Sequence, residues 1–224
     1  MTKKNNRRSG DARQQIIDAI LASRVTSRSL KKPADIKRYL AQYFANIPFE
    51  DLEGRSEPIM ARVALDHLDF GAERKPGQAL LRIFNANEKE HGYSSAFTFV
   101  EMVNDDMPFL VDSVAAAINR HDLGVHITVH PIISVTRDED GKLLSVTDTN
   151  GDGATESFIR FAISRETDPQ QLKLLRKEIT KVLSDVRVTV RDWGAMRQRM
   201  RETRDLLEKG PKGVDPLLRT ESQA

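Results

Sequence analysis

One stretch, residues 97–135, constrains the fold more than any other, because it predicts a strand, a helix and a second strand in direct succession. Apolar residues alternate at its start, which indicates the first strand. Apolar residues at offsets of four, seven and eight from Leu110 define one face of a helix, and Gly124 can end that helix. From Val125 the alternation continues for eleven residues and predicts the second strand. Such a chain forms a sheet with a crossover helix.

The segments before this stretch indicate helices and one further strand. We expect three helices between residues 11 and 75, the first capped by Asp11 and the third starting at Ser56 and ending before Gly71. A strand at 79–84 then pairs with the strand at 96–103, since the polar loop between them contains a glycine.

The segments after it continue the sheet. Asp140-Gly141 lies between two alternating runs and predicts a hairpin. A strand follows at 157–164, and a helix starts after Asp168-Pro169. Three alternating valines predict a last strand at 186–190, and Asp192 caps a final helix.

The order of these elements from residue 96 to 190 is the ferredoxin-like plan. We therefore predict an α+β fold, in which an antiparallel sheet carries both of its helices on one face. A small helical N-terminal segment, either a separate subdomain or a packed cap, precedes it. The expected divisions are a disordered basic arm (1–10), the helical segment (11–75), the sheet domain (76–192), a C-terminal helix (193–210) and a flexible tail (211–224).

Charge and composition restrict the class of protein. The 224 residues have a net charge of +2, but the first 40 hold 11 Lys+Arg against 3 Asp+Glu. A basic arm can bind nucleic acid, although a solvated tail is commoner, so nucleic acid is an unlikely partner. The absence of cysteine excludes disulfides and suits a cytoplasmic protein. No apolar run reaches the ~18 residues of a membrane span.

The connection between the first strand and its helix holds the best candidate site. Asp105 or Asp106 can cap the helix, and Pro108 is tolerated in its first turn. The same carboxylates and the helix N-terminus can instead bind the ammonium and carboxylate groups of an amino acid. The candidate ligand-binding residues are Asn104, Asp105, Asp106, Met107 and Pro108.

A metal site is not expected. His126 and His130 share a strand face, but their Cα atoms lie roughly 13 Å apart at ~3.3 Å per residue, too far to hold one ion together. We expect these histidines to line a half-buried face of the sheet or a subunit contact.

Several motifs resemble one protein family. The runs Val-Asn-Asp-Asp-Met-Pro-Phe-Leu-Val-Asp-Ser-Val (103–114) and Gly-Val-His-Ile-Thr-Val-His-Pro-Ile-Ile (124–133) resemble the N-terminal region of the large bacterial NAD-dependent glutamate dehydrogenases. Three shorter pieces, at 75–85, 156–161 and 191–196, agree in the same order.

The resemblance implies ACT-like folding units that precede a catalytic part. The whole enzyme would convert L-glutamate to 2-oxoglutarate and ammonium with NAD, while this fragment would hold no cofactor and no catalytic residue. The implied partners are the rest of the dehydrogenase chain, further copies in a homo-oligomer and an amino-acid effector. ACT loops that bind amino acids typically have glycine after the proline, where this sequence has Phe109. No complete Gly-x-Gly-x-x-Gly fingerprint occurs in the 224 residues.

Two alternatives to a regulatory module are a ferredoxin-like nucleic-acid-binding module with a basic arm and a scaffold without a ligand. RNA-binding sheets of this plan expose aromatic residues that stack on bases. Here Phe97, Phe99 and Phe161 share their faces with valine and isoleucine, which favours a core position.

Overall fold

The computed structural model describes residues 14–15, 17–19, 22, 26–48, 52, 56–149, 151 and 153–209. It contains two compact units, Met1–Leu183 and Ser184–Ala224. The basic arm at 1–10 and the tail at 211–224 lie outside the described residues. Of the helix expected after Asp11, the described residues 14–15, 17–19 and 22 are helical.

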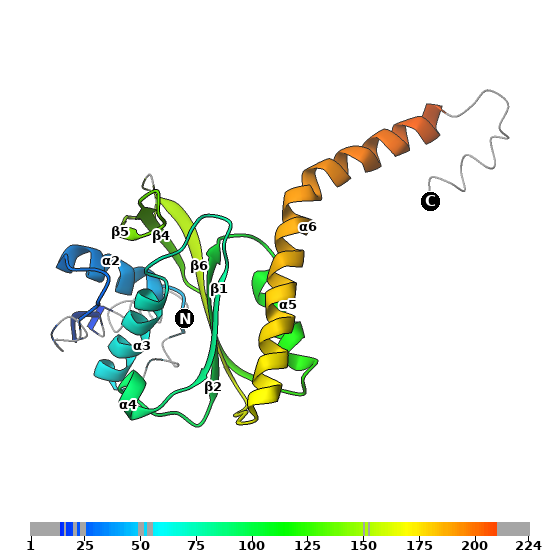
Figure 1. Cartoon of the computed structure of the whole chain (residues 1–224). Helices are drawn as coiled ribbons and strands as arrows, with labels where there is room; N and C mark the ends of the chain where they lie inside the picture. The colour runs from blue at the N-terminus through cyan, green and yellow to red at the C-terminus, as the bar shows by residue number, and fades with distance from the viewer. Residues whose placement is uncertain are drawn as a thin grey trace, which may run out of the picture. The chain divides into compact units, whose positions relative to one another are not determined.

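The first unit is built on a six-stranded antiparallel sheet with the order β1-β2-β6-β4-β5, in which β3 also pairs with β6 (Figure 1). As predicted, the strand before the loop pairs with its neighbour, and Leu80 lies opposite Val103. The six strands are β1 (Leu80–Asn85), β2 (Thr98–Asp105), β3 (Val125–Val129), β4 (Ile132–Arg137), β5 (Leu143–Val146) and β6 (Ala154–Ile163).

The long strand expected from Val125 is divided into β3 and β4 at His130-Pro131. Proline has no backbone N–H to donate to the ladder, so regular pairing stops there. The carbonyl of Pro131 still accepts from the Phe158 N–H at 3.0 Å, which keeps both halves beside β6. The predicted hairpin joins β4 to β5, and Gly141 provides the positive φ of 88° that its turn requires.

Helices cover both faces of this sheet (Figure 1). On one face lie α5 (Leu110–Asn119) and the first part of α6 (Pro169–Lys209), the two helices that the ferredoxin-like plan requires. On the other face lie α2 (Pro33–Phe44) and α3 (Glu57–Phe70), and the short α4 (Glu88–His91) follows β1. The N-terminal helical segment is therefore a packed cap. Its core residues include Tyr39, Leu40, Ala64 and Leu65, which cluster with Phe158 of β6.

The prediction of a strand at 186–190 is wrong, because these residues belong to α6. Valine favours strands through its branched Cβ, but three alternating valines are a short and ambiguous signal. No glycine or proline interrupts the chain between Pro169 and Gly194, so the helix continues. The sheet position beside β2 that this strand would take is occupied by β1.

Candidate functional site

The candidate loop, residues 104–108, connects the end of β2 to α5. Asn104 and Asp105 are the last residues of β2; Asn104 is buried and Asp105 is half-buried. Asp106 and Pro108 are exposed, and Met107 is half-buried between them. The structure therefore brings the two carboxylates to the same end of the sheet, one turn before the helix.

Neither aspartate caps α5, which corrects the helix-cap interpretation. The chain stays extended through Asp105, and the Asp106 N–H donates to the carbonyl of Thr155 at 3.1 Å. The residue at the N-cap is Phe109, which has φ 71° and makes no side-chain cap. An N-cap side chain must lie next to the first helical residue, so carboxylates this far upstream cannot take that role.

Asp105 is held by the chain itself. One of its carboxylate oxygens accepts from Nη2 of Arg74 at 2.9 Å, and the other accepts from the backbone N–H of Gly77 at 2.9 Å. Burial opposes the charged form of Arg74, but hydrogen bonds and attraction from Glu156 and Asp105 outweigh it and raise the pKa of the guanidinium. Asp105 therefore fixes the loop to the segment before β1.

Arg74 belongs to a buried ionic cluster beneath the loop. Glu156, which is 1% exposed, accepts from Arg74 Nη2 at 2.7 Å and from Nε and Nη2 of Arg137 at 2.8 Å each. Arg137 also donates to the carbonyls of Gly71 and Gly141. This cluster ties β4, β6 and the segment after α3 to the end of β2, so the loop stands on a rigid base.

Asp106 is connected to the sheet through Ser157. The hydroxyl of Ser157 donates to Asp106 Oδ1 at 2.7 Å, and Nε2 of His130 lies 3.0 Å from the same hydroxyl oxygen. Since the hydroxyl proton points to the carboxylate, Nε2 of His130 is the donor to Ser157. Burial lowers the pKa of His130, with Asp106 acting in the opposite direction, so this histidine is neutral at pH 7.

The second strand histidine has a similar partner. Nε2 of His126 lies 3.1 Å from the hydroxyl of Ser164, the residue directly after β6, whereas the serine that His130 contacts, Ser157, lies within β6. Across the described part of the chain, no group of three or more His, Cys, Asp or Glu residues could hold a metal ion.

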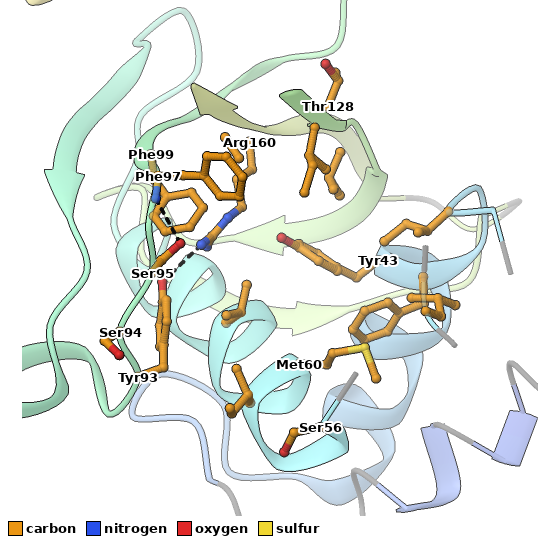
Figure 2. Close-up of a pocket in the computed structure, with 18 residues that line it drawn as sticks. Tyr43, Ser56, Met60, Tyr93, Ser94, Ser95, Phe97, Phe99, Thr128 and Arg160 are labelled. Carbon is orange, nitrogen blue, oxygen red and sulfur yellow. Dashed lines mark hydrogen bonds between the residues drawn. The ribbon is translucent and has the colours of Figure 1, made fainter. Parts of the chain in front are cut away.

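The opposite face of the sheet contains a pocket of about 360 Å³ that the sequence did not indicate. Figure 2 shows it between α2, α3 and the strands, with Tyr43 pointing inward from α2 and Arg160 reaching it from β6. Its walls are mainly aliphatic and aromatic. The guanidinium of Arg160 lies 3.8 Å from the centre of the Phe99 ring and donates to the Tyr93 hydroxyl at 3.0 Å.

The charged group of this wall, Arg160, is paired inside the protein. Arg160 forms an ion pair with the buried Glu101, which also binds Arg82, and Arg82 in turn pairs with Asp66 at 2.6 Å. Two carboxylates thus face two guanidinium groups, so the buried network is electrically balanced. Such a network aligns α3 with β1, β2 and β6.

His67 completes the network as a neutral residue. Burial lowers its pKa to about 4. Nε2 of His67 lies 3.3 Å from the carbonyl of Met102, so Nε2 holds the proton. Nδ1 then accepts from the Tyr43 hydroxyl at 3.4 Å, which leaves the phenol oxygen facing the pocket as an acceptor. The signal in the sequence is the presence of two charged residues, Glu101 and Arg160, between apolar neighbours in β2 and β6.

These features define a class of protein. The strand order, the crossover helix α5 and the helix α6 on the same face describe a ferredoxin-like domain of the ACT type, in which β1 takes the edge position beside β2 and a helical cap covers the other face. Among the described residues, no helix is long and apolar enough to cross a membrane.

Comparison with known proteins identifies the family. The sequence model described as "Glutamate dehydrogenase, ACT1 domain" matches residues 39–179, and the chain belongs to this family. It is 32% identical over 201 residues to an NAD-specific glutamate dehydrogenase of Halomonas elongata, covering 88% of this chain and 12% of that protein. It is 29% identical over 192 residues to the NAD-specific glutamate dehydrogenase of Pseudomonas aeruginosa, covering 84% of this chain and 12% of that protein.

Proposed function

We propose that this chain is the N-terminal regulatory and assembly region of a large NAD-dependent glutamate dehydrogenase of the cytoplasm. The support is that both relatives have this activity in their names and that the chain spans 12% of their length. In this proposal the whole enzyme oxidises L-glutamate to 2-oxoglutarate and ammonium with NAD bound outside this chain. The chain contributes no catalytic group and works within a homo-oligomer.

The regulatory ligand in this proposal is an amino acid bound at the loop 104–108. The observation that carries it is the start of α5, where Phe109 at the N-cap adopts the left-handed conformation and makes no side-chain cap. A helix N-terminus attracts a carboxylate through its backbone N–H groups and its dipole. The exposed Asp106 lies beside it and provides the negative charge that an ammonium group needs. Asp105 has a positioning role, because Arg74 and Gly77 already engage both of its oxygens.

A nucleic-acid-binding module is less well supported. Helices lie on both faces of the sheet (Figure 1). Phe99 and Phe161, on the two central strands, are buried and therefore not placed to stack on bases.

Thermal unfolding in the presence of each amino acid tests the regulatory site. A ligand that binds only the folded state stabilises it by about 2.7 kcal/mol at a hundredfold excess over Kd. For a chain of this size that raises Tm by roughly 5–10 °C. Asp106→Asn should keep the ligand-free Tm and lose the shift, because it removes the charge and retains the oxygen that accepts from Ser157. The matched control Asp112→Asn removes an exposed carboxylate from the first turn of α5 and should keep the shift.

Two results would count against the proposal. If no amino acid at millimolar concentration shifts the Tm of a well-folded sample, the loop is structural. Turnover of L-glutamate with NAD by the purified chain, free of host enzyme, would show that the chain is catalytic.

A further inference from the structure

The described part of the second unit, 184–209, belongs to α6 and exposes several large apolar side chains. In this part of α6 the exposed large hydrophobic residues include Trp193 (53% exposed), Met196 (51%) and Met200 (73%). Large apolar side chains that gather on one element, unlike those scattered singly, mark a surface that another molecule covers.

The spacing of these residues shows that they share one face. Trp193, Met196 and Met200 follow each other at intervals of three and four, the spacing of the a and d positions of a heptad. The same repeat continues from the first unit, because Ile179 lies fourteen residues before Trp193 and Leu175 lies twenty-one before Met196. Leu175 and Ile179 are fully buried. The repeat that packs against protein in the first unit therefore extends into a segment where it is exposed.

The charges beside this stripe indicate what covers it. From Trp193 to Arg204 the chain has four arginines, at 197, 199, 201 and 204, against the single acid Glu202. Flanking charges select the partner of a heptad helix. A second copy of this chain aligned over the same segment would place arginines against arginines, which is unfavourable. A helix with acidic residues beside its apolar stripe would instead pair with them.

We propose that Trp193, Met196 and Met200 form the centre of a docking surface for an amphipathic helix with acidic flanks, supplied by another part of the large dehydrogenase. The origin of this helix rests on the proposed function, since the chain spans 12% of the length of its relatives. The chemistry of the helix rests only on the repeat and the charges of α6.

The fluorescence of Trp193 tests the surface directly, because it is the single tryptophan of the chain. The purified chain is titrated with two synthetic heptad peptides that have the same apolar positions and carry either glutamate or lysine beside them. We expect a saturable blue shift of the emission with the glutamate peptide and none with the lysine peptide. Added salt should weaken the binding, since it screens exposed charges.

Two variants separate the stripe from the rest of the helix. Met200→Asp should lower the affinity for the glutamate peptide at least tenfold, because it places a charge within the apolar stripe. The matched control Gln198→Asp adds the same charge to the other side of the helix and should change the affinity by less than threefold. Circular dichroism checks that both variants stay helical.

Three outcomes would overturn the docking surface. They are an equal response to both peptides, no response to the glutamate peptide, and a blue shift that depends on the concentration of the chain alone, which would mean that a second copy covers the stripe. None of these readouts measures the turnover of free L-glutamate or NAD, so the docking surface can be refuted independently of the assignment to a dehydrogenase.

Discussion

The substitution Glu156→Gln should destabilise the first unit strongly, although it changes the shape of the side chain very little. Glu156 is 1% exposed and is bound by two arginines, whose side chains are 2% exposed for Arg74 and 7% for Arg137. Removing one partner of a buried ion pair leaves the other charge uncompensated and costs about 3–5 kcal/mol. Here two guanidinium groups lose their shared carboxylate.

The expected decrease in Tm follows from this cost. For a chain of 150–250 residues, 1 kcal/mol corresponds to roughly 2–4 °C, so we expect Tm to fall by about 6–20 °C. Urea denaturation followed by circular dichroism gives the free energy of unfolding. Glu178→Gln is the matched control, because Glu178 also binds two basic residues, Arg120 and His121, but its side chain is 30% exposed, so water weakens these ion pairs. If Glu156→Gln lowers the free energy of unfolding no more than the control does, the buried cluster does not stabilise the loop.

Two further predictions concern pH and the backbone. Burial lowers the pKa of His67 to about 4 in the folded state. Between pH 6.5 and pH 4 the unfolded chain therefore binds more protons than the folded chain. The contribution of His67 to the free energy of unfolding is complete above pH 6.5 and is lost as the pH falls through this window. The free energy of unfolding decreases by about 3 kcal/mol over this window, which urea denaturation at several pH values should show. If the free energy of unfolding of His67→Gln depends on pH as steeply as that of the parent, His67 is not the origin of the decrease. Phe109 has φ 71° and an exposed side chain, so Phe109→Gly should leave the free energy of unfolding equal or up to about 1 kcal/mol higher. Phe109→Val, with a branched Cβ, should lower it, and a Gly variant less stable than the Val variant would show that the aromatic ring is what holds the loop.

Local signals in the sequence predicted the parts of the fold that local chemistry determines. The bounds of α3 follow from Ser56 and Gly71, and the β4–β5 turn follows from Asp140-Gly141. The division of β3 from β4 was not predicted, because the alternation runs on through Pro131, although the missing N–H of this proline interrupts the ladder.

What the sequence did not predict depends on partners that are distant in the chain. Arg74 and Glu156 are 82 residues apart, and their ion pair decides that Asp105 holds the loop and does not cap α5. No periodic pattern reports such a pair. At 186–190 the alternation of three valines favours a strand, but no glycine or proline interrupts the chain between Pro169 and Gly194, and the segment is helical.

The regulatory role is tested most directly in the full-length dehydrogenase that contains this sequence. The initial rate of glutamate-dependent NAD reduction is measured with and without the amino acid that raises the Tm of the isolated chain, in the parent enzyme and in Asp106→Asn. We predict equal rates for the two enzymes without that amino acid, and a change of rate on its addition in the parent alone. The same response in both enzymes, or a variant that has lost its basal rate, would contradict a regulatory site at this loop.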